Sequence, residues 1–148
     1  MTTEHVILLV EDNNDDATLT LRALRKQQIA NEVVVAADGE TALDYLFGEG
    51  TFKGRDLRVV PQVILLDLNL PGIDGLGVLK RIRADERTRL LPVVVLTSSK
   101  QDEDVINSYS LGANAYMRKP VDFVRFAEAV RTLGLFWLVH NEIAPRRL

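Results

Sequence analysis

The sequence predicts a doubly wound α/β domain, in which a five-stranded parallel sheet lies between two layers of helices. The first indication is alternation, because five short apolar runs are each followed by a segment with apolar residues at helical spacing. The second is the run at residues 63–66, which is continuously apolar, as expected for a strand buried on both faces of a sheet. The third is that four of the runs end in polar residues, which is where parallel sheets form their ligand sites.

The predicted strands cover residues 6–10, 32–36, 63–66, 93–96 and 115–118. After the first strand, Asn13 or Asn14 can cap a helix. Asp15 and Asp16 then lie in its first turn, and we interpret them as surface acids that complement the helix dipole. The apolar residues that predict the five helices are Ala17, Leu21 and Leu24; Leu43, Leu46 and Phe47; Leu76, Leu79 and Ile82; Val105, Ile106 and Tyr109; and Phe126, Val130, Leu133 and Trp137.

Turn-forming residues separate these elements. Asp38 and Gly39 predict a turn after the second strand. Residues 48–60 form the longest predicted loop, to which we assign no chemistry. A glycine-rich bend is expected before the third helix, at Gly72, Gly75 and Gly77.

The last two helices have candidate boundary residues. Ser99 is a plausible N-cap for the fourth helix, and Gly112 is expected to end it. The final helix is predicted to begin at Asp122 and to continue to about Val139.

Composition restricts the class of protein. A chain of 148 residues is long enough for one self-sufficient core. The net charge of −3 gives no basic face for nucleic acid, and the absence of cysteine excludes disulfides and thiolate sites. No apolar run reaches the roughly 18 residues that cross a membrane, and no leader is evident, so we expect a cytoplasmic protein.

Polar side chains of different chemistry follow the strands: Glu11 and Asp12 after the first, Asp67 after the third, Thr97 after the fourth and Lys119 after the fifth. In the flavodoxin-like strand order 2-1-3-4-5 these side chains converge. Clustered carboxylates repel one another, and oxygen ligands suit Mg²⁺, which is often completed by a phosphate. Lys119 and Thr97 can bind the phosphate oxygens, while a carboxylate can act as the nucleophile.

This pattern resembles the receiver domain of two-component response regulators. The resemblance extends from Val6 to the final helix and implies one receiver domain over residues 1–148, with a core at about 5–140 and a tail at 141–148. The motifs that carry it are Glu11-Asp12, Asp67 with the following residues 68–75, Thr97-Ser98, Gly112-Ala113, Tyr116 and Lys119-Pro120.

The resemblance implies that Asp67 accepts a phosphoryl group from a sensor histidine kinase. It also implies that Asp12 and Asp67 bind Mg²⁺, with the main-chain oxygen of Asn69 as a third ligand. Glu11 would act through bound water, although an aspartate is frequent at this position in the family, so its side chain reaches one methylene further.

The same resemblance implies that Thr97 and Lys119 contact the phosphoryl group. Tyr116 would change orientation with Thr97, and the surface of the fourth helix, fifth strand and fifth helix would change with them. The Lys119-Pro120 bond would be cis. Such a protein catalyses only its own phosphorylation and dephosphorylation, so we do not expect an enzyme that acts on an outside substrate.

The end of the final helix is apolar around nearly its whole circumference. Because one domain cannot bury every side of a terminal helix, we expect a homodimer through Leu135, Phe136, Trp137 and Leu138, although core packing under a loop is an alternative. No output domain follows, so the protein is expected to act by docking. The apolar ending and the long loop resemble single-domain regulators that partner bacterial phytochrome kinases.

Three other functions fit the fold class. A phosphatase or mutase with an aspartyl phosphate would need a general acid where this chain has Asn69. A flavin or nucleotide carrier would need a phosphate-binding loop where Glu11 and Asp12 would repel phosphate. A pseudo-receiver that docks without phosphorylation is disfavoured because the acid, hydroxyl and lysine set is complete.

Overall fold

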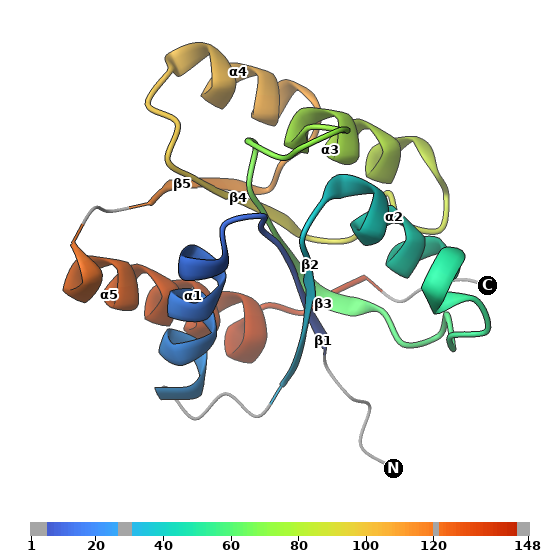
Figure 1. The fold of residues 1–148 in the computed structure, drawn as a ribbon, viewed down its shortest axis with the longest axis horizontal. Helices are drawn as coiled ribbons and strands as arrows, with labels where there is room; N and C mark the ends of the chain where they lie inside the picture. The colour runs from blue at the N-terminus through green and yellow to red at the C-terminus, as the bar shows by residue number, and fades with distance from the viewer. Residues whose placement is uncertain (1–5, 27–30, 120–121, 145–148) are drawn as a thin grey trace.

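The computed structural model describes residues 6–26, 31–119 and 122–144. Its centre is a five-stranded parallel sheet in the order β2-β1-β3-β4-β5, which confirms the predicted topology (Figure 1). The strands are β1 (Val6–Val10), β2 (Glu32–Ala36), β3 (Pro61–Leu66), β4 (Val93–Thr97) and β5 (Ala115–Arg118).

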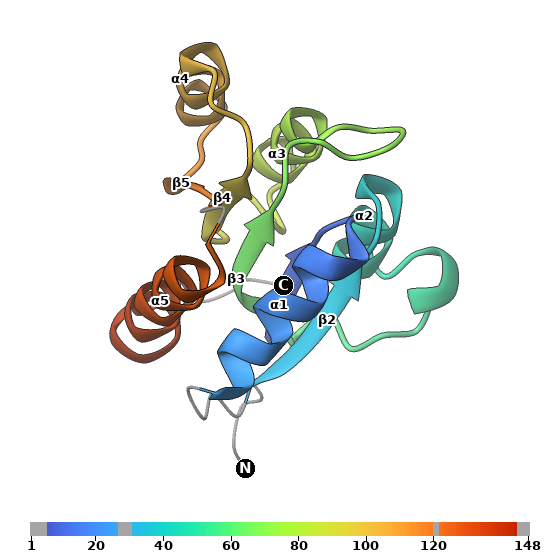
Figure 2. The same ribbon diagram turned by 60° about the vertical axis from the view of Figure 1, so that its left-hand side comes forward.

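Alternate residues of the central strands build two cores, one on each face of the sheet. Leu8 and Ile64 pack in the first core, with α2 (Gly39–Phe47) and α3 (Gly75–Ala84). Ile7 and Val63 pack in the second core, between α1 (Asn14–Lys26) and α5 (Phe123–Gly134). Figures 1 and 2 show α1 and α5 together on one face and α2, α3 and α4 (Asp102–Ser110) on the other. Because successive side chains of a strand point to opposite faces, a continuously apolar strand serves both cores.

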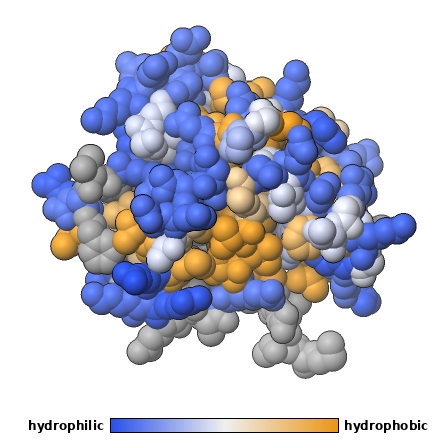
Figure 3. Space-filling view, in the orientation of Figure 1, coloured by the Kyte–Doolittle hydropathy of each residue, from blue (hydrophilic) through white to orange (hydrophobic). Residues whose placement is uncertain are grey.

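The edge strand β2 is less covered than the central strands. Val33 and Val34 are half-buried, and Val35 is exposed. Figure 3 shows apolar surface over this strand, between α1 and α2. None of the helices within residues 6–26, 31–119 and 122–144 is long and apolar enough to cross a membrane.

Several predicted boundaries are corrected by the structure. The expected turn at Asp38 and Gly39 is the start of α2, where the Asp38 carboxylate accepts a hydrogen bond from the Thr41 N–H. Ser99 is not the N-cap of α4, because that helix begins at Asp102 after Gln101. The Ser99 hydroxyl instead donates to the Asp104 carboxylate in the first turn of the helix.

The last helix changes geometry before it ends. The expected start at Asp122 is within one residue of the observed one: Asp122 is the N-cap of α5, and its carboxylate accepts a hydrogen bond from the Val124 N–H. After Gly134 the chain continues as one π-helical segment, Leu135–His140, which we call η2. The predicted end near Val139 is therefore close to the observed one, although regular α-helix stops earlier.

The bend expected at Gly75 and Gly77 lies inside α3. An ideal Cβ on Gly75 would be 2.4 Å from the Asp67 carbonyl oxygen and 2.5 Å from the Leu68 Cα. This close approach of α3 fixes the main chain that follows β3, directly at Asp67. Glycine is therefore required here by contact with the backbone.

We predict that Gly75→Ala lowers the free energy of unfolding by about 1–3 kcal/mol, because the added methyl group must push backbone atoms apart. Gly77→Ala is the matched control, since its Cβ would meet only side-chain atoms of Ile73 and Asp74, at 3.0 and 3.2 Å. The cost of these contacts in Gly77→Ala is offset by helix propensity, which favours alanine over glycine by about 1 kcal/mol. Urea unfolding of both variants measures the difference, and equal stabilities would show that the approach at Gly75 is no constraint.

Candidate functional site

The carboxyl ends of β1, β3, β4 and β5 meet at one edge of the sheet. The register places Val10 opposite Leu66 and Leu66 opposite Val95, so the residues that follow these strands are neighbours. The polar side chains brought together there are Glu11, Asp12, Asp67, Thr97 and Lys119, as the sequence predicts.

Three acids form a compact group at this edge. Carboxylate oxygens of Glu11, Asp12 and Asp67 all lie within 4.8 Å of one another. Glu11 and Asp67 are buried, whereas Asp12 is exposed, so the group is open to solvent on one side. This set consists of oxygen ligands only and has room for retained water, so it fits a hard divalent cation such as Mg²⁺.

Both oxygens of the Asp67 carboxylate accept hydrogen bonds. The Thr97 hydroxyl donates to Oδ1 over 2.9 Å, and the Asn69 N–H donates to the same oxygen over 3.2 Å. The Lys119 ammonium donates to Oδ2 over 3.0 Å. The buried carboxylate therefore lies between a hydroxyl on β4 and an ammonium after β5.

Lys119 contacts three carboxylates at once. Its Nζ lies 2.8 Å from Glu11 Oε1, 2.9 Å from Asp16 Oδ2 and 3.0 Å from Asp67 Oδ2. The Lys119 side chain is only 8% exposed. An ammonium group has three donors, so all of them are in use.

Asp16 is the site residue that sequence reasoning missed. Its position in the first turn of α1 suggested a surface acid, yet its carboxylate faces Lys119 across the site. The neighbouring acid Asp15 is exposed and makes no ion pair within the described part of the chain. A helical turn rotates consecutive side chains by about 100°, so only one of the two faces the sheet edge.

The pKa values of the two buried carboxyl groups, Glu11 and Asp67, are shifted in opposite directions. Burial raises the pKa of Glu11 to about 8, and its hydrogen bond with Asp67 adds to this rise, against the effect of Lys119. Burial also acts to raise the pKa of Asp67, but the hydrogen bond with Glu11 and the charge of Lys119 hold it below its usual value. Asp67 is thus the ionised member of the pair at neutral pH.

The same surroundings shift the pKa of the Lys119 ammonium group. Burial acts to lower the pKa of its ammonium group, but the hydrogen bonds to Glu11, Asp16 and Asp67 outweigh burial and raise the pKa above its usual value. Lys119 therefore remains a cation at any pH near neutrality. A permanent positive charge beside Asp67 suits the stabilisation of added negative charge.

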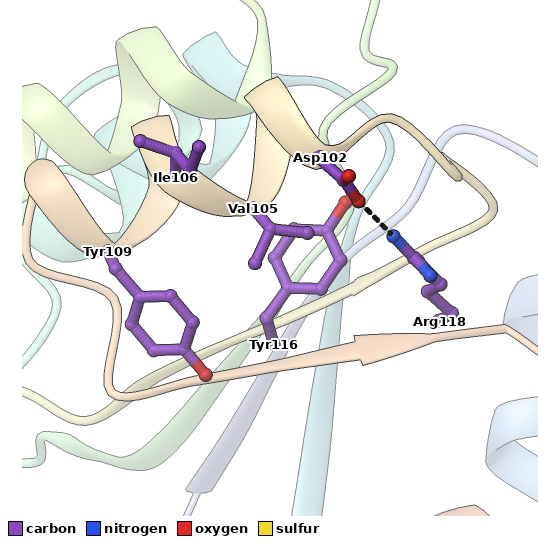
Figure 4. Close-up of a pocket in the computed structure, with 6 residues that line it drawn as sticks. All are labelled: Asp102, Val105, Ile106, Tyr109, Tyr116 and Arg118. Carbon is purple, nitrogen blue, oxygen red and sulfur yellow. Dashed lines mark hydrogen bonds and ion pairs between the residues drawn. The ribbon is translucent and has the colours of Figure 1, made fainter.

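Tyr116 lies at a groove next to the site. The groove, of about 560 Å³, is lined by Asp102, Val105, Ile106, Tyr109, Tyr116 and Arg118. Figure 4 shows the Tyr116 ring between β5 and α4, with its hydroxyl toward the start of α4. This hydroxyl is buried and has no hydrogen-bond partner among the described residues. Arg118 pairs with Asp102 across the mouth of the groove over 3.4 Å.

Three further predictions concern Asn69, the Lys119-Pro120 bond and the dimer surface. Asn69 is exposed beside the acids, and a metal contact of its main-chain oxygen stays a prediction. The Lys119-Pro120 bond, expected to be cis, lies outside the described residues. Of the predicted dimer surface, Leu135 and Phe136 are 46% and 51% exposed, whereas Trp137 and Leu138 pack partly on the domain's own core.

Comparisons with known proteins agree with this geometry. Residues 7–131 match the response regulator receiver domain. The chain is 43% identical over 137 residues to the probable methanogenesis regulatory protein FilR2 of Methanothrix harundinacea, covering 92% of this chain and 85% of FilR2. It is 38% identical over 133 residues to the response regulator Rcp1 of Synechocystis, covering 90% and 88% of the two chains.

Solved structures extend the likeness to nearly the whole chain. The phosphorylated cyanobacterial phytochrome response regulator RcpA has a TM-score of 0.88 at 37% identity, with 95% and 98% of the chains covered. Mn²⁺-bound Rcp1 has a TM-score of 0.87 at 36% identity, covering 95% and 99%. The bacteriophytochrome response regulator RtBRR is 51% identical, with a TM-score of 0.76 over 96% and 85%. The chain therefore belongs to the response regulator receiver domain family.

Proposed function

We propose that this chain is a single-domain response regulator that accepts a phosphoryl group on Asp67 from a histidine kinase. The observation that carries the proposal is the Asp67 carboxylate, which is buried, ionised and contacted on its two oxygens by Thr97 and Lys119. An ionised carboxylate is the form that attacks phosphorus, and a hydroxyl and an ammonium on either side can bind the incoming oxygens.

Phosphoryl transfer would proceed by in-line displacement at phosphorus. An oxygen of Asp67 forms the new P–O bond while the P–N bond of the kinase phosphohistidine breaks, and the imidazole leaves with the electron pair. Lys119 and Thr97 donate hydrogen bonds to the phosphoryl oxygens, on which negative charge is spread in the transition state.

A Mg²⁺ ion would be held by Asp12, Asp67 and the main-chain oxygen of Asn69, with Glu11 acting through bound water. When bound, the ion neutralises charge on the transferred group. Support comes from the open group of oxygen ligands and from the relative Rcp1, which has a Mn²⁺-bound form.

The output of the switch would be the α4-β5-α5 surface. Thr97 would move toward the phosphoryl group, and Tyr116 would follow into the space that Thr97 leaves. The buried Tyr116 hydroxyl, which has no hydrogen-bond partner among the residues that the structure describes, supports this role, because such a donor favours a second position in which it is paired. The adjacent groove would change shape with the ring.

The partner kinase is proposed to be a sensor histidine kinase of the bacteriophytochrome type. Support comes from the likeness to RcpA, a cyanobacterial phytochrome response regulator, and to RtBRR, a bacteriophytochrome response regulator. A pseudo-receiver that docks without phosphorylation remains the alternative, and an aspartyl-phosphate phosphatase is less favoured because Asn69 offers no acid.

The phosphoacceptor is tested with acetyl phosphate in the presence and absence of Mg²⁺. We predict that the wild type gains one phosphoryl group only with Mg²⁺, and that Asp67→Asn gains none because the amide cannot act as the nucleophile. Asp56→Asn, which alters an exposed acid in a distant loop, serves as the control. Intact-protein mass spectrometry at low temperature measures the gain, and equal labelling of wild type and Asp67→Asn would reject the assignment.

The raised pKa of Glu11 predicts a pH dependence of stability in the metal-free protein. The folded state holds a proton on Glu11 up to about pH 8, whereas the unfolded chain releases it near the ordinary glutamate pKa of 4.5. The folded state therefore binds more protons between these values, and stability falls as pH rises through that range. Between pH 6 and 9 we expect the wild type to lose on the order of 2 kcal/mol relative to Glu11→Gln. Urea unfolding in chelator at both pH values measures this, and parallel curves would contradict the prediction.

The homodimer is proposed to form through the exposed part of the predicted surface. Replacing Leu135 and Phe136 together by serine should yield folded monomers, because both side chains are about half exposed in the single chain. Ile106→Ser is the control, since Ile106 is 63% exposed on α4, away from this surface. Gel filtration with light scattering at micromolar concentration gives the oligomeric state. A monomeric wild type, or loss of the dimer in Ile106→Ser alone, would contradict the proposal.

A further inference from the structure

Lys119 has a carboxylate partner that lies outside the acid group. Asp16 accepts a hydrogen bond from Lys119 Nζ over 2.9 Å, although its oxygens are not part of the group formed by Glu11, Asp12 and Asp67. Its side chain is 33% exposed, against 8% for Lys119. Asp16 therefore contacts the ammonium from the α1 side and faces solvent itself.

The position of Asp16 is fixed by the start of α1. The Asn13 side chain accepts a hydrogen bond from the Asp16 N–H over 3.0 Å, and the Asp16 carbonyl accepts from the Thr20 hydroxyl over 2.8 Å. The helix itself packs on α5 and on the sheet. The Asp16 carboxylate is thus attached to a rigid element.

The Lys119 side chain needs such a contact. It has four rotatable bonds, and its main chain is held on β4 by the hydrogen bond from its N–H to the Thr97 carbonyl over 2.7 Å. Restricting a lysine side chain costs conformational entropy, which contacts with fixed carboxylates offset before the reaction begins. Of the three partners of Lys119, Asp67 is the group that changes and Glu11 is proposed to act on the metal. Asp16 is therefore the contact that neither step uses.

We propose that Asp16 is a positioning residue, which holds the Lys119 ammonium beside Asp67 Oδ2 so that it is in place when the phosphoryl group arrives. This inference rests on the proposed function. Asp16 does not contact the reacting atoms, and it acts only through Lys119. Pre-positioned charge lowers a barrier because no reorganisation is then needed during the reaction.

Asp15 provides a matched comparison. It lies in the same helical turn, carries the same charge and is exposed. Any effect of net charge or of the helix dipole is common to Asp15→Asn and Asp16→Asn. Only Asp16→Asn weakens the contact with Lys119.

The test measures the rate of phosphorylation by acetyl phosphate at saturating Mg²⁺. We expect Asp16→Asn to react roughly tenfold more slowly than Asp15→Asn, which is below the 10²–10³ lost when a donor to the reacting atoms is removed. Asp16→Glu should recover part of the rate, because a longer carboxylate can still reach the ammonium. In a Lys119→Gln background, Asp16→Asn should have no further effect.

A second measurement does not depend on phosphorylation. In the metal-free protein, the ¹⁵N-labelled ammonium of Lys119 should give a slowly exchanging signal in wild type and in Asp15→Asn. Asp16→Asn should shift or broaden this signal, while its backbone amide spectrum shows that the fold is retained.

The outcomes separate the two proposals. If the wild type incorporates no phosphoryl group, the proposed function is rejected and the role of Asp16 with it. If the wild type is phosphorylated but Asp16→Asn and Asp15→Asn react equally fast, only the positioning role is rejected. An additive effect of Asp16→Asn in the Lys119→Gln background would also reject it, because Asp16 would then act by another route.

Discussion

The charge balance at the carboxyl edge of the sheet is the constraint on which the site depends. Acids from β1, from α1 and from the end of β3 are brought into one small volume, and the ammonium of Lys119 is hydrogen-bonded to three of them. Burial and the neighbouring Asp67 raise the pKa of Glu11, which favours a proton there, and Lys119 provides a cation among the acids. The divalent ion proposed for this site would meet the same need.

The parallel sheet makes this concentration of polar groups possible. All five strands run in the same direction, so every carboxyl end lies at one edge, and the order β2-β1-β3-β4-β5 puts β3 between β1 and β4. Asp67 follows β3, and the neighbouring strands therefore deliver acids on one side and Thr97 on the other. The close approach at Gly75 then fixes the main chain around Asp67. Packing on both faces of β3 therefore holds the Asp67 carboxylate in position.

The two ends of the sheet have different roles. The carboxyl end bears the charged group, while the opposite end is closed by η2, where the Gln62 side-chain amide donates to the Trp137 carbonyl over 3.2 Å. Trp137 and Leu138 complete the core beneath α5, and Leu135 and Phe136 face outward. One part of this π-helical segment thus packs on the domain, and the other part is exposed.

The sequence by itself determined the fold class, the five strands and five of the clustered side chains. This was possible because buried strands appear in the sequence as continuous apolar runs. In a parallel sheet, the residues that follow neighbouring strands also lie close together. The family followed from the same residues, since Asp67, Thr97 and Lys119 stand at the ends of consecutive strands in the second half of the sheet.

Only the tertiary structure decided the contacts that depend on helix rotation and close approach. Asp15 and Asp16 are equivalent in sequence, but the orientation of α1 on the sheet turns Asp16 alone toward Lys119. Serine is a residue type that often caps helices, yet Ser99 lies in the loop after β4, and α4 begins only at Asp102. The apolar residues 135–138 were alike in sequence, and the π-helical turn separated those in the core from those on the surface. Side-chain direction is a property of packed elements, so residue type and spacing could not supply it.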